Sequence, residues 1–245
     1  MAAIVLASGS GELALAGGSA LIMHGIIDRD TQDVDAFAEG EGADTAALAA
    51  DVTDALRAAG YTVTDVSPTP TSTLRKLIAT RRRRVPVEVG ISFDPRVRPT
   101  VPTRVGPAID PIELGANKIL ALYSDPSRAR DVDDLARLCT RYRFAEMLHL
   151  ADTKQRTPVD REMLADSFGM LSTADQRLYP RGTDITAIRA FARGIALHLS
   201  RSEPLPVSPY PAGATAEDGL CSSTSTRSGH PCRRRSSNGH CHLHR

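Results

Sequence analysis

The sequence has no apolar run approaching the roughly 20 residues that a membrane-spanning helix needs. Its opening, MAAIVLASGSGE, contains a short apolar stretch without the preceding basic segment of a secretory signal peptide. Four cysteines, of which Cys139 stands alone and three lie near the C-terminus, do not form an even disulfide framework. These absences argue against a membrane-spanning helix and a disulfide-stapled secreted domain, and they predict a cytoplasmic location.

Lysine is nearly absent as well. Of the 30 basic residues 27 are arginine, and the three lysines are Lys76, Lys118 and Lys154. The net charge is only +1, with 25 basic and 26 acidic residues up to Arg201. A neutral body cannot hold nucleic acid by bulk charge, so such a partner needs local patches such as the arginine run at 81–84. In so arginine-rich a chain, each lysine is a candidate for a specific role.

The pattern of the chain changes near Pro107 and again after Arg201. Its 245 residues, 41% of them hydrophobic, can form one domain or two small ones. Before the first change, short apolar runs alternate with helical segments, which predicts an α/β core over 1–108. Helical spacing then predicts a helical domain over 109–201. A stretch rich in Pro, Ala and Gly predicts a linker and tail over 202–245.

The spacing of apolar residues also predicts individual elements. Strands are expected at 13–16, 33–38, 61–66, 74–80 and 85–92, and helices at 19–25, 44–59, 144–154, 158–171 and 184–200, with two more between 111 and 138. The strands at 74–80 and 85–92 should form a hairpin with the arginine run at its tip. Those arginines would either grip an RNA backbone or form a solvated turn.

Gly17, Gly18 and Ser19 follow an apolar strand and open a helix. Backbone N–H groups at such a turn, together with the positive end of the helix, suit a phosphate. Glycine lets the backbone approach the anion closely, and Ser19 adds a hydroxyl donor. Tight packing of a strand on a helix produces the same pattern, so this turn does not decide the function alone.

Asp33 and Asp35 are separated by Val34, so on a strand both carboxylates share one face while Val34 points into the core. Two carboxylates this close repel each other, and one is driven toward protonation unless a cation lies between them. The pair therefore indicates Mg²⁺ or Mn²⁺ held by oxygen ligands, with a solvated strand edge or a helix cap as the alternative.

A third acid, Glu88, emerges from the expected strand at 85–92 on the face opposite Val87 and Val89. Three carboxylates on neighbouring strands can hold two divalent ions. One ion would lower the pKa of an attacking hydroxyl, and the other would steady a triphosphate and its leaving group. Asp94 is the alternative to Glu88 in this role.

Two linked motifs resemble a known family. The segments GGSALIMHG and RDTQDVDAF resemble the opening motif of the polymerase-beta-like nucleotidyltransferase superfamily. With ELGANKILALYSDPSRARDVDDLARL added, the chain looks like the AbiEii/MenT-type nucleotidyltransferases, in which a lysine-containing helix and an R-D-x-x-D-L segment follow the core. The resemblance covers roughly residues 13–138. It implies a small mixed sheet with flanking helices, then a helical domain and a flexible tail.

The resemblance also implies roles for residues. It makes Gly18 and Ser19 phosphate contacts, Asp33 and Asp35 metal ligands, Lys118 a triphosphate contact and Asp131 the acid of the last motif, with Asp134 a weaker candidate. Arg29 matches an arginine of the family and would either touch a phosphate or balance Asp28 and Asp30. A lysine is a mobile point charge suited to phosphates, although a lysine extending from an ordinary helix is the plain alternative for Lys118. His24 is expected to be a packed residue and not a base.

The C-terminal tail carries a separate set of metal-binding residue types. Cys221, Cys232, Cys241 and His244 supply three thiolates and one imidazole, a complete tetrahedral set for zinc. His230, His240 and His242 compete as ligands. A disordered basic tail is the alternative.

Together these features predict an enzyme that transfers NMP from an NTP to an acceptor and releases pyrophosphate. The resemblance implies an RNA acceptor such as the 3′ end of tRNA, a role as the toxin of a toxin–antitoxin or phage-defence pair, and a cognate antitoxin. One alternative is a small-molecule acceptor such as an antibiotic. The other is a non-catalytic nucleic-acid-binding protein built on a degenerate transferase core.

Overall fold

The strands form one mixed sheet. The computed structural model describes residues 1–211 apart from residues 10, 30, 32, 41, 70 and 83. Within this part, seven strands have the order β3-β4-β5-β2-β1-β7-β6. Their bounds are β1 Leu13–Ala16, β2 Asp33–Glu39, β3 Thr62–Asp65, β4 Arg75–Thr80, β5 Val87–Asp94, β6 Val101–Thr103 and β7 Gly106–Ala108. β2 pairs with β5 and β1 with β7 in parallel, and the other neighbours are antiparallel.

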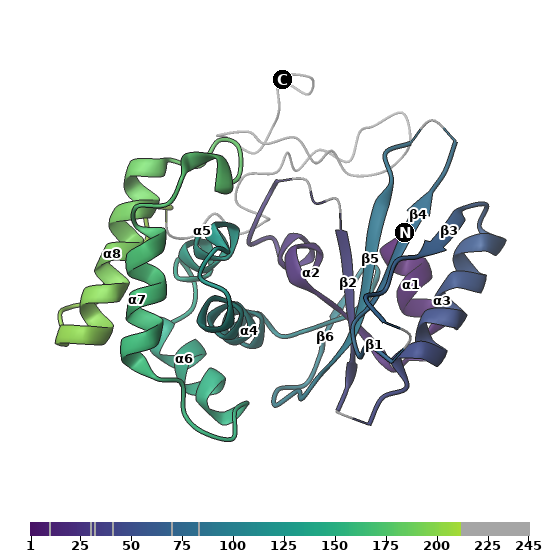
Figure 1. Ribbon diagram of the computed structural model, residues 1–245, viewed down its shortest axis with the longest axis horizontal. Coiled ribbons are helices and arrows are strands. Elements are labelled where there is room, and N and C mark those ends of the chain that lie inside the picture. The colour runs from purple at the N-terminus through teal and green to yellow at the C-terminus, as the bar shows by residue number, and fades with distance from the viewer. Residues whose placement is uncertain are drawn as a thin grey trace, which may run out of the picture.

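Helices cover both faces of this sheet. Their bounds are α1 Ala2–Ser8, α2 Gly17–Met23, α3 Thr45–Ala58, α4 Pro111–Ser124, α5 Ala129–Leu138, α6 Phe144–Thr153, α7 Arg161–Leu171 and α8 Ile185–Arg201, with a short 3-10 helix, η1, at Gln176–Leu178. α1 and α3 lie on one face, whereas α2 lies on the other with α4 to α8 beyond it (Figure 1). The predicted α/β fold with a mixed sheet and flanking helices is confirmed.

Simple sequence signals explain the elements that carry the site. In β2, Val34, Ala36 and Ala38 are buried on the side of α1 and α3, which leaves Asp33 and Asp35 facing the other way. The predicted helix at 44–59 is present as α3, whose first turn is capped by the Asp44 carboxylate. The predicted hairpin of β4 and β5 is also present.

The chain changes from strands to helices between Ala108 and Pro111. Asp110 caps α4, and Pro111 occupies the first turn, where a missing N–H group costs nothing. Phe144 of α6 and Phe168 of α7 meet edge to face, with ring centroids 6.3 Å apart. No helix among the residues described is both long and apolar enough to cross a membrane.

The segment that follows α8 returns to the helical part and packs against α5. The Ser208 hydroxyl donates to the carbonyl oxygen of Ala136 at 2.6 Å, and the Tyr210 hydroxyl donates to Asp133. The Arg137 guanidinium lies 4.0 Å from the centroid of the Tyr210 ring. Residues 202–211, for which composition predicted a linker, are therefore anchored by a buried acid and a cation–π contact.

Candidate active site

The acidic residues gather where β2 and β5 begin. In the parallel pairing of these strands, Asp33 is opposite Glu88 and Asp35 is opposite Gly90. Paired residues of neighbouring strands point to the same face, so the three acids share the face covered by α2 and α4. The predicted constellation of carboxylates thus comes together on adjacent strands.

Two glycines enclose the Asp35 carboxylate. Gly17 has a φ of +56°, and a Cβ atom there would collide with Oδ2 of Asp35. A Cβ atom on Gly90 would lie 2.8 Å from Oδ1 of Asp35, which is closer than real Cβ contacts allow. Gly17 also needs glycine for its left-handed backbone. The carboxylate is thus held between β5 and the start of α2 in a space that exists because two side chains are missing.

The surroundings of Asp35 disfavour its charge. Burial, helped by the negative charges of Asp33 and Glu88, raises the pKa of Asp35 to about 6, although Lys118 and Arg128 act in the opposite direction. A divalent cation beside Asp33 and Asp35 would relieve both the repulsion and the loss of solvation. The donor set, two carboxylates on one face of β2, has the oxygen ligands that such an ion prefers.

The glycine turn lies against this carboxylate pair. The Ser19 hydroxyl donates to the backbone carbonyl of Asp33 at 2.8 Å, so in this structure it fastens α2 to β2. A Cβ atom on Gly18 would point toward Thr31 Oγ1 at 3.5 Å and Arg29 Nη2 at 3.9 Å. The turn therefore faces the segment that leads into β2, with an arginine beside it.

Lys118 of α4 is held by two acids of α5. Its Nζ lies 2.5 Å from Oδ1 of Asp131 and 2.8 Å from Oδ2 of Asp134. Burial alone would lower the pKa of Lys118, but the charges of Asp134 and Asp131 outweigh it and raise this pKa above its ordinary value. Lys118 is therefore a permanent positive charge near Asp35.

Asp134 has a second partner in Arg29, whose Nη2 lies 2.8 Å from Oδ1 of the carboxylate. Burial opposes ionisation of Asp134, but the charges of Lys118 and Arg29 outweigh it and lower its pKa. The sequence ranked Asp134 below Asp131, yet both acids hold Lys118. The acids expected to balance Arg29 were its chain neighbours Asp28 and Asp30. Its partner Asp134 is instead 105 residues away in the sequence.

Arg128 is a site residue that sequence reasoning missed. It precedes α5, and its Nε lies 2.5 Å from Oδ2 of Asp131. Its side chain is 49% exposed, so the guanidinium can still meet a ligand. Its charge reaches Asp35 and acts to lower the pKa of that carboxyl. The signal was present in the quoted segment SRARD, where two arginines precede the acid.

Glu88 and Asp94, the two candidates for a third carboxylate, have different surroundings. Glu88 lies beside Asp33, but its Oε1 is 2.9 Å from Nζ of Lys76. Asp94 is at the far end of β5, opposite Glu39, and its Oδ1 is 2.5 Å from Nζ of Lys154. Asp94 therefore cannot replace Glu88. No cluster of three or more Asp, Glu, His or Cys side chains in the part that the structure covers is arranged to hold a metal.

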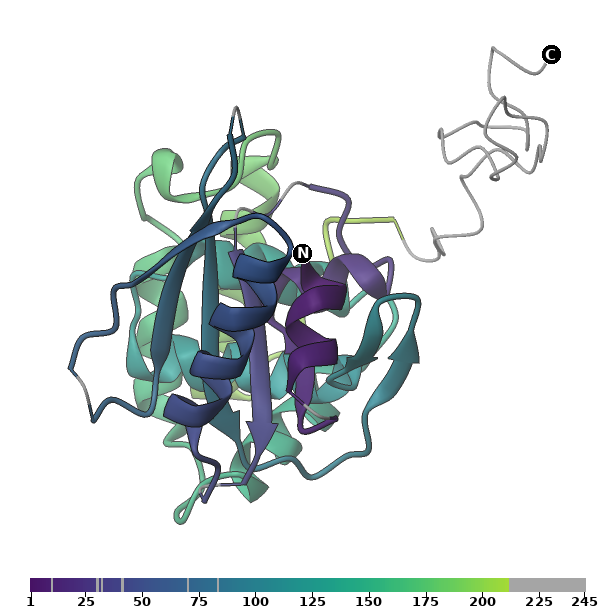
Figure 2. The same ribbon diagram turned by 90° about the vertical axis from the view of Figure 1, so that its right-hand side faces the viewer.

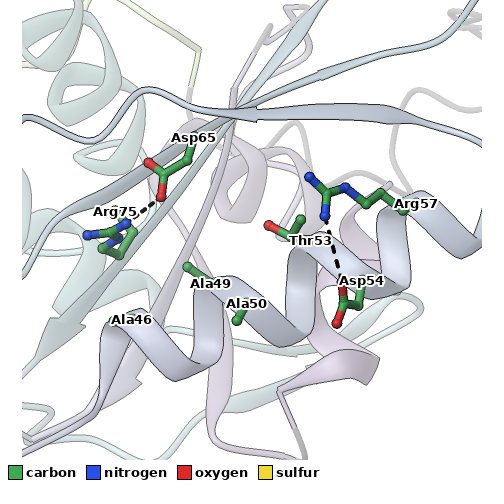
Figure 3. A pocket seen from close by; sticks show the side chains of 8 residues that line it. All are labelled: Ala46, Ala49, Ala50, Thr53, Asp54, Arg57, Asp65 and Arg75. Atoms are coloured by element: carbon green, nitrogen blue, oxygen red, sulfur yellow. Dashed lines mark hydrogen bonds and ion pairs between the residues drawn. The ribbon is translucent and has the colours of Figure 1, made fainter. Parts of the chain in front are cut away.

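His24 and a hollow beside α3 take no part in the acidic site. His24 Nε2 is 2.8 Å from the carbonyl oxygen of Ile109, as expected for a packed histidine. The zinc set Cys221, Cys232, Cys241 and His244 lies outside the described residues. A separate hollow of about 310 Å³ lies beside α3 and is lined by Thr53, Arg57, Asp65 and Arg75, among others (Figure 3). It is on the sheet face opposite Asp35.

Solved structures with a similar fold are nucleotidyltransferases where their names state a function. MenT4, a nucleotidyltransferase toxin from Mycobacterium tuberculosis, is 17% identical, with a TM-score of 0.56 over 82% of this chain and 80% of that one. JHP933 from Helicobacter pylori is 16% identical, with a TM-score of 0.51 over 82% and 88%. A putative nucleotidyltransferase from H. pylori is 15% identical, with a TM-score of 0.50 over 82% and 91%. At these identities the likeness shows the fold alone.

The family model described as nucleotidyl transferase AbiEii toxin, type IV TA system, matches residues 1–194. No curated protein matches the sequence. The fold and this family model together indicate a nucleotidyltransferase. The chain belongs to the AbiEii family of nucleotidyl transferase toxins, which confirms the family that the sequence motifs indicated. Membership implies an NTP substrate and a cognate antitoxin.

Proposed function

We propose that this protein is a metal-dependent toxin that transfers NMP from an NTP to an RNA acceptor and releases pyrophosphate. The observation that carries the proposal is the half-buried Asp35 carboxylate, which is enclosed by Gly17 and Gly90 and repelled by Asp33. Such an arrangement is costly unless a cation compensates the charges. The arrangement of these two carboxylates is therefore better explained as a cation-binding site than as a purely structural feature.

In this proposal Asp33 and Asp35 hold Mg²⁺ or Mn²⁺. The bound ion would supply Lewis-acid chemistry, lowering the pKa of an attacking hydroxyl and neutralising phosphate charge. The Asp35 carboxylate is held in one position between Gly17 and Gly90, where any side chain on either glycine would collide with it. The Ser19 hydroxyl holds α2 against β2 and so keeps Gly17 and Gly18 beside the carboxylate pair.

The cations on the opposite side of the site would bind the triphosphate. Lys118 is a fixed positive charge, and Arg128 is exposed enough to contact a ligand directly. Both charges act on the Asp35 carboxylate, and this proximity supports a role for them at the reacting phosphate. Asp131 and Asp134 position the lysine, and Arg29 neutralises Asp134 and lies beside Gly18. Charge that develops on the departing pyrophosphate would be stabilised there.

The sequence predicted two ions, with Glu88 as a shared ligand. A second ion would require Glu88 to leave Lys76, because that lysine now neutralises it at 2.9 Å. Glu88 is in register with Asp33, so a change of side-chain rotamer would suffice. We keep the two-ion arrangement as part of the proposal, with Lys76 as the residue that competes with the second ion.

The test is a transfer assay. Purified protein is incubated with total RNA, Mg²⁺ and each labelled NTP in turn, with Asp35→Asn as the control. The expected result is a label on RNA with strong preference for one NTP, because a pocket that hydrogen-bonds one base leaves polar groups unpaired with another. RNA without label under every NTP would reject RNA as the acceptor. The same assay with small hydroxylated acceptors then decides whether the chemistry itself is wrong.

A further inference from the structure

The tip of the β4–β5 hairpin is a basic arm beside the candidate active site. This arm comprises residues 81–86, between the end of β4 at Thr80 and the start of β5 at Val87. β5 begins next to Asp33, because Glu88 and Asp33 are paired in parallel strands. The arm therefore extends beyond the end of the sheet at which the acidic pair lies, and both views show it projecting there (Figures 1 and 2).

The three described arginines of the arm form no ion pairs within the described part of the fold. Arg81, Arg82 and Arg84 are exposed, and none of the three forms an ion pair with any residue that the structure describes. In contrast, Arg75, a few residues earlier in the same hairpin, is paired with Asp65. Unpaired cations close together repel one another, so the arm is best suited to a ligand that carries several negative charges.

The scaffold presents these arginines in an ordered way. The β4–β5 ladder continues to the pair Ala79 and Val87, and the Arg84 N–H donates to the carbonyl oxygen of Arg81 at 2.9 Å. The Arg81 guanidinium lies 5.4 Å from the centroid of the Tyr61 ring, a cation–π contact that limits its freedom. Val85 at the tip is 68% exposed, which adds an apolar surface to the cationic one.

We propose that this arm binds the phosphodiester backbone of the acceptor RNA and leads its reactive end to Asp33 and Asp35. This inference rests on the proposed function, because it names the surface that the acceptor uses. Arg84 is four residues before Glu88, which corresponds to about 13 Å of extended strand. That separation favours a long polyanion over the triphosphate, for which the proposed site is at Lys118 and Arg128.

An acidic protein would also be attracted to arginines, but the placement favours RNA. The arm adjoins the strand that carries Glu88, whereas Lys118 and Arg128 act on Asp35 from α4 and from the residue before α5. An acceptor on the arm and an NTP on those cations would thus reach the acidic pair from two different parts of the fold. Transfer between two substrates requires this geometry, whereas protein binding does not.

The experiment compares two triple variants of the full chain. Arg81→Ala, Arg82→Ala and Arg84→Ala are combined in the arm variant. The control combines Arg156→Ala, Arg181→Ala and Arg193→Ala, which removes the same charge from exposed positions of the helical part. Affinity for a labelled single-stranded RNA is measured over a range of salt concentrations. Losing three phosphate contacts should reduce the salt slope by about 2, since each contact to a single strand contributes about 0.7.

A second variant separates charge from folding. With Arg81, Arg82 and Arg84 all changed to Lys, the salt slope should recover, because lysine also neutralises phosphate. In the transfer assay the arm variant should raise the KM for RNA about 10-fold or more, consistent with that loss of contacts, without changing the KM for NTP. Equal salt slopes in the arm variant and the control would overturn the inference.

The outcomes distinguish this inference from the proposed function. If the wild type labels RNA but the arm variant binds RNA normally, the inference about the arm is wrong and the proposed function stands. If RNA binding depends on the arm but no NMP is transferred from any NTP, the proposed function is wrong and the inference about the arm stands. Polyglutamate serves as a probe for an acidic protein. If the arm variant loses binding to polyglutamate but keeps RNA binding, the arm binds an acidic protein instead. No RNA binding by the wild type would overturn both.

Discussion

A Cβ atom on Gly90 would lie 2.8 Å from Oδ1 of Asp35, so the residue of β5 beside this carboxylate must have no side chain. Gly90→Ala should therefore displace the Asp35 carboxylate while β5 stays in place, because a side-chain end yields more easily than a strand. We expect transfer activity to fall about 100-fold, as for a misplacement of about 1 Å, and the free energy of unfolding to change by about 1 kcal/mol or less.

The matched control is Gly169→Ala in α7, where no atom lies within 4 Å of the added Cβ. This substitution should keep full activity and stabilise the helix by about 0.5–1 kcal/mol. Activity is measured by nucleotide transfer and stability by urea denaturation. Full activity of Gly90→Ala would show that the position of the Asp35 carboxylate does not matter.

The metal-free protein should lose stability as the pH rises through the titration of Asp35. Its pKa is about 6 in the folded protein against 3.8 for an ordinary aspartate, so the unfolded chain releases this proton first. The contribution of Asp35 to the free energy of unfolding should therefore fall by about 3 kcal/mol between about pH 4 and pH 6. Asp35→Asn carries no charge to titrate and should be the more stable protein at neutral pH without metal.

Asp51→Asn, at an exposed position of α3, is the control for that comparison. Denaturation is measured in a chelator and then with Mg²⁺. The ion should raise the Tm of the wild type and of the control but not of Asp35→Asn, since the carboxylate provides the ligand. A wild type and an Asp35→Asn variant with the same pH dependence would contradict the buried charge.

Lys118 should affect both NTP binding and stability. Lys118→Met leaves Asp131 and Asp134 buried with fewer cations, which should lower the free energy of unfolding by about 3 kcal/mol. The double variant Lys118→Met/Asp131→Asn should regain much of that stability, since Arg128 is half exposed and tolerates the loss of its partner. Both variants should still show a KM for NTP raised about 10-fold or more, because neither restores the positive charge. A KM for NTP that stays at the wild-type value in the double variant would restrict Lys118 to a structural role.

The ion pair between Lys76 and Glu88 makes a prediction about metal affinity. Lys76→Met would leave Glu88 beside Asp33 without a partner and so make the site more negative. Mn²⁺ should then bind about 5-fold more tightly, which corresponds to about 1 kcal/mol of charge interaction. Titration calorimetry with a non-hydrolysable NTP present would also show whether a second ion appears. Lys76→Arg, which keeps the pair, is the control, and equal Mn²⁺ affinity in all three proteins would exclude Glu88 from the metal site.

Local signals made much of the fold predictable. The alternation in β2, the Asp44 cap of α3 and the apolar spacing of the later helices each depend on residues close in the chain, and the structure has all of them. α1 was missed because six of its seven residues are apolar, so it shows no alternation of polar and apolar positions. β6 and β7, with three residues each, gave no alternation to read.

The residues of the candidate site could be predicted from the sequence, but the contacts between them could not. Sequence motifs identified the acids and Lys118, because short spacings fix which side chains share a face. The ion pair of Arg29 with Asp134 joins residues far apart, and no local pattern could indicate it. The pairing of Glu88 with Lys76 likewise depends on the register of β4 against β5. Charge partners across a fold follow from tertiary packing and not from sequence spacing.

One turn of α5 joins three separate parts of the chain. Asp131, Asp133 and Asp134 are all buried there and are partnered by side chains from α4, from the segment before β2 and from the segment after α8. A fragment that ends near residue 108 would keep the acidic pair but lack Lys118 and Arg128, and a fragment that begins there would leave Asp134 without Arg29. The two predicted domains are thus electrostatically interdependent, and neither should show even partial activity when expressed without the other.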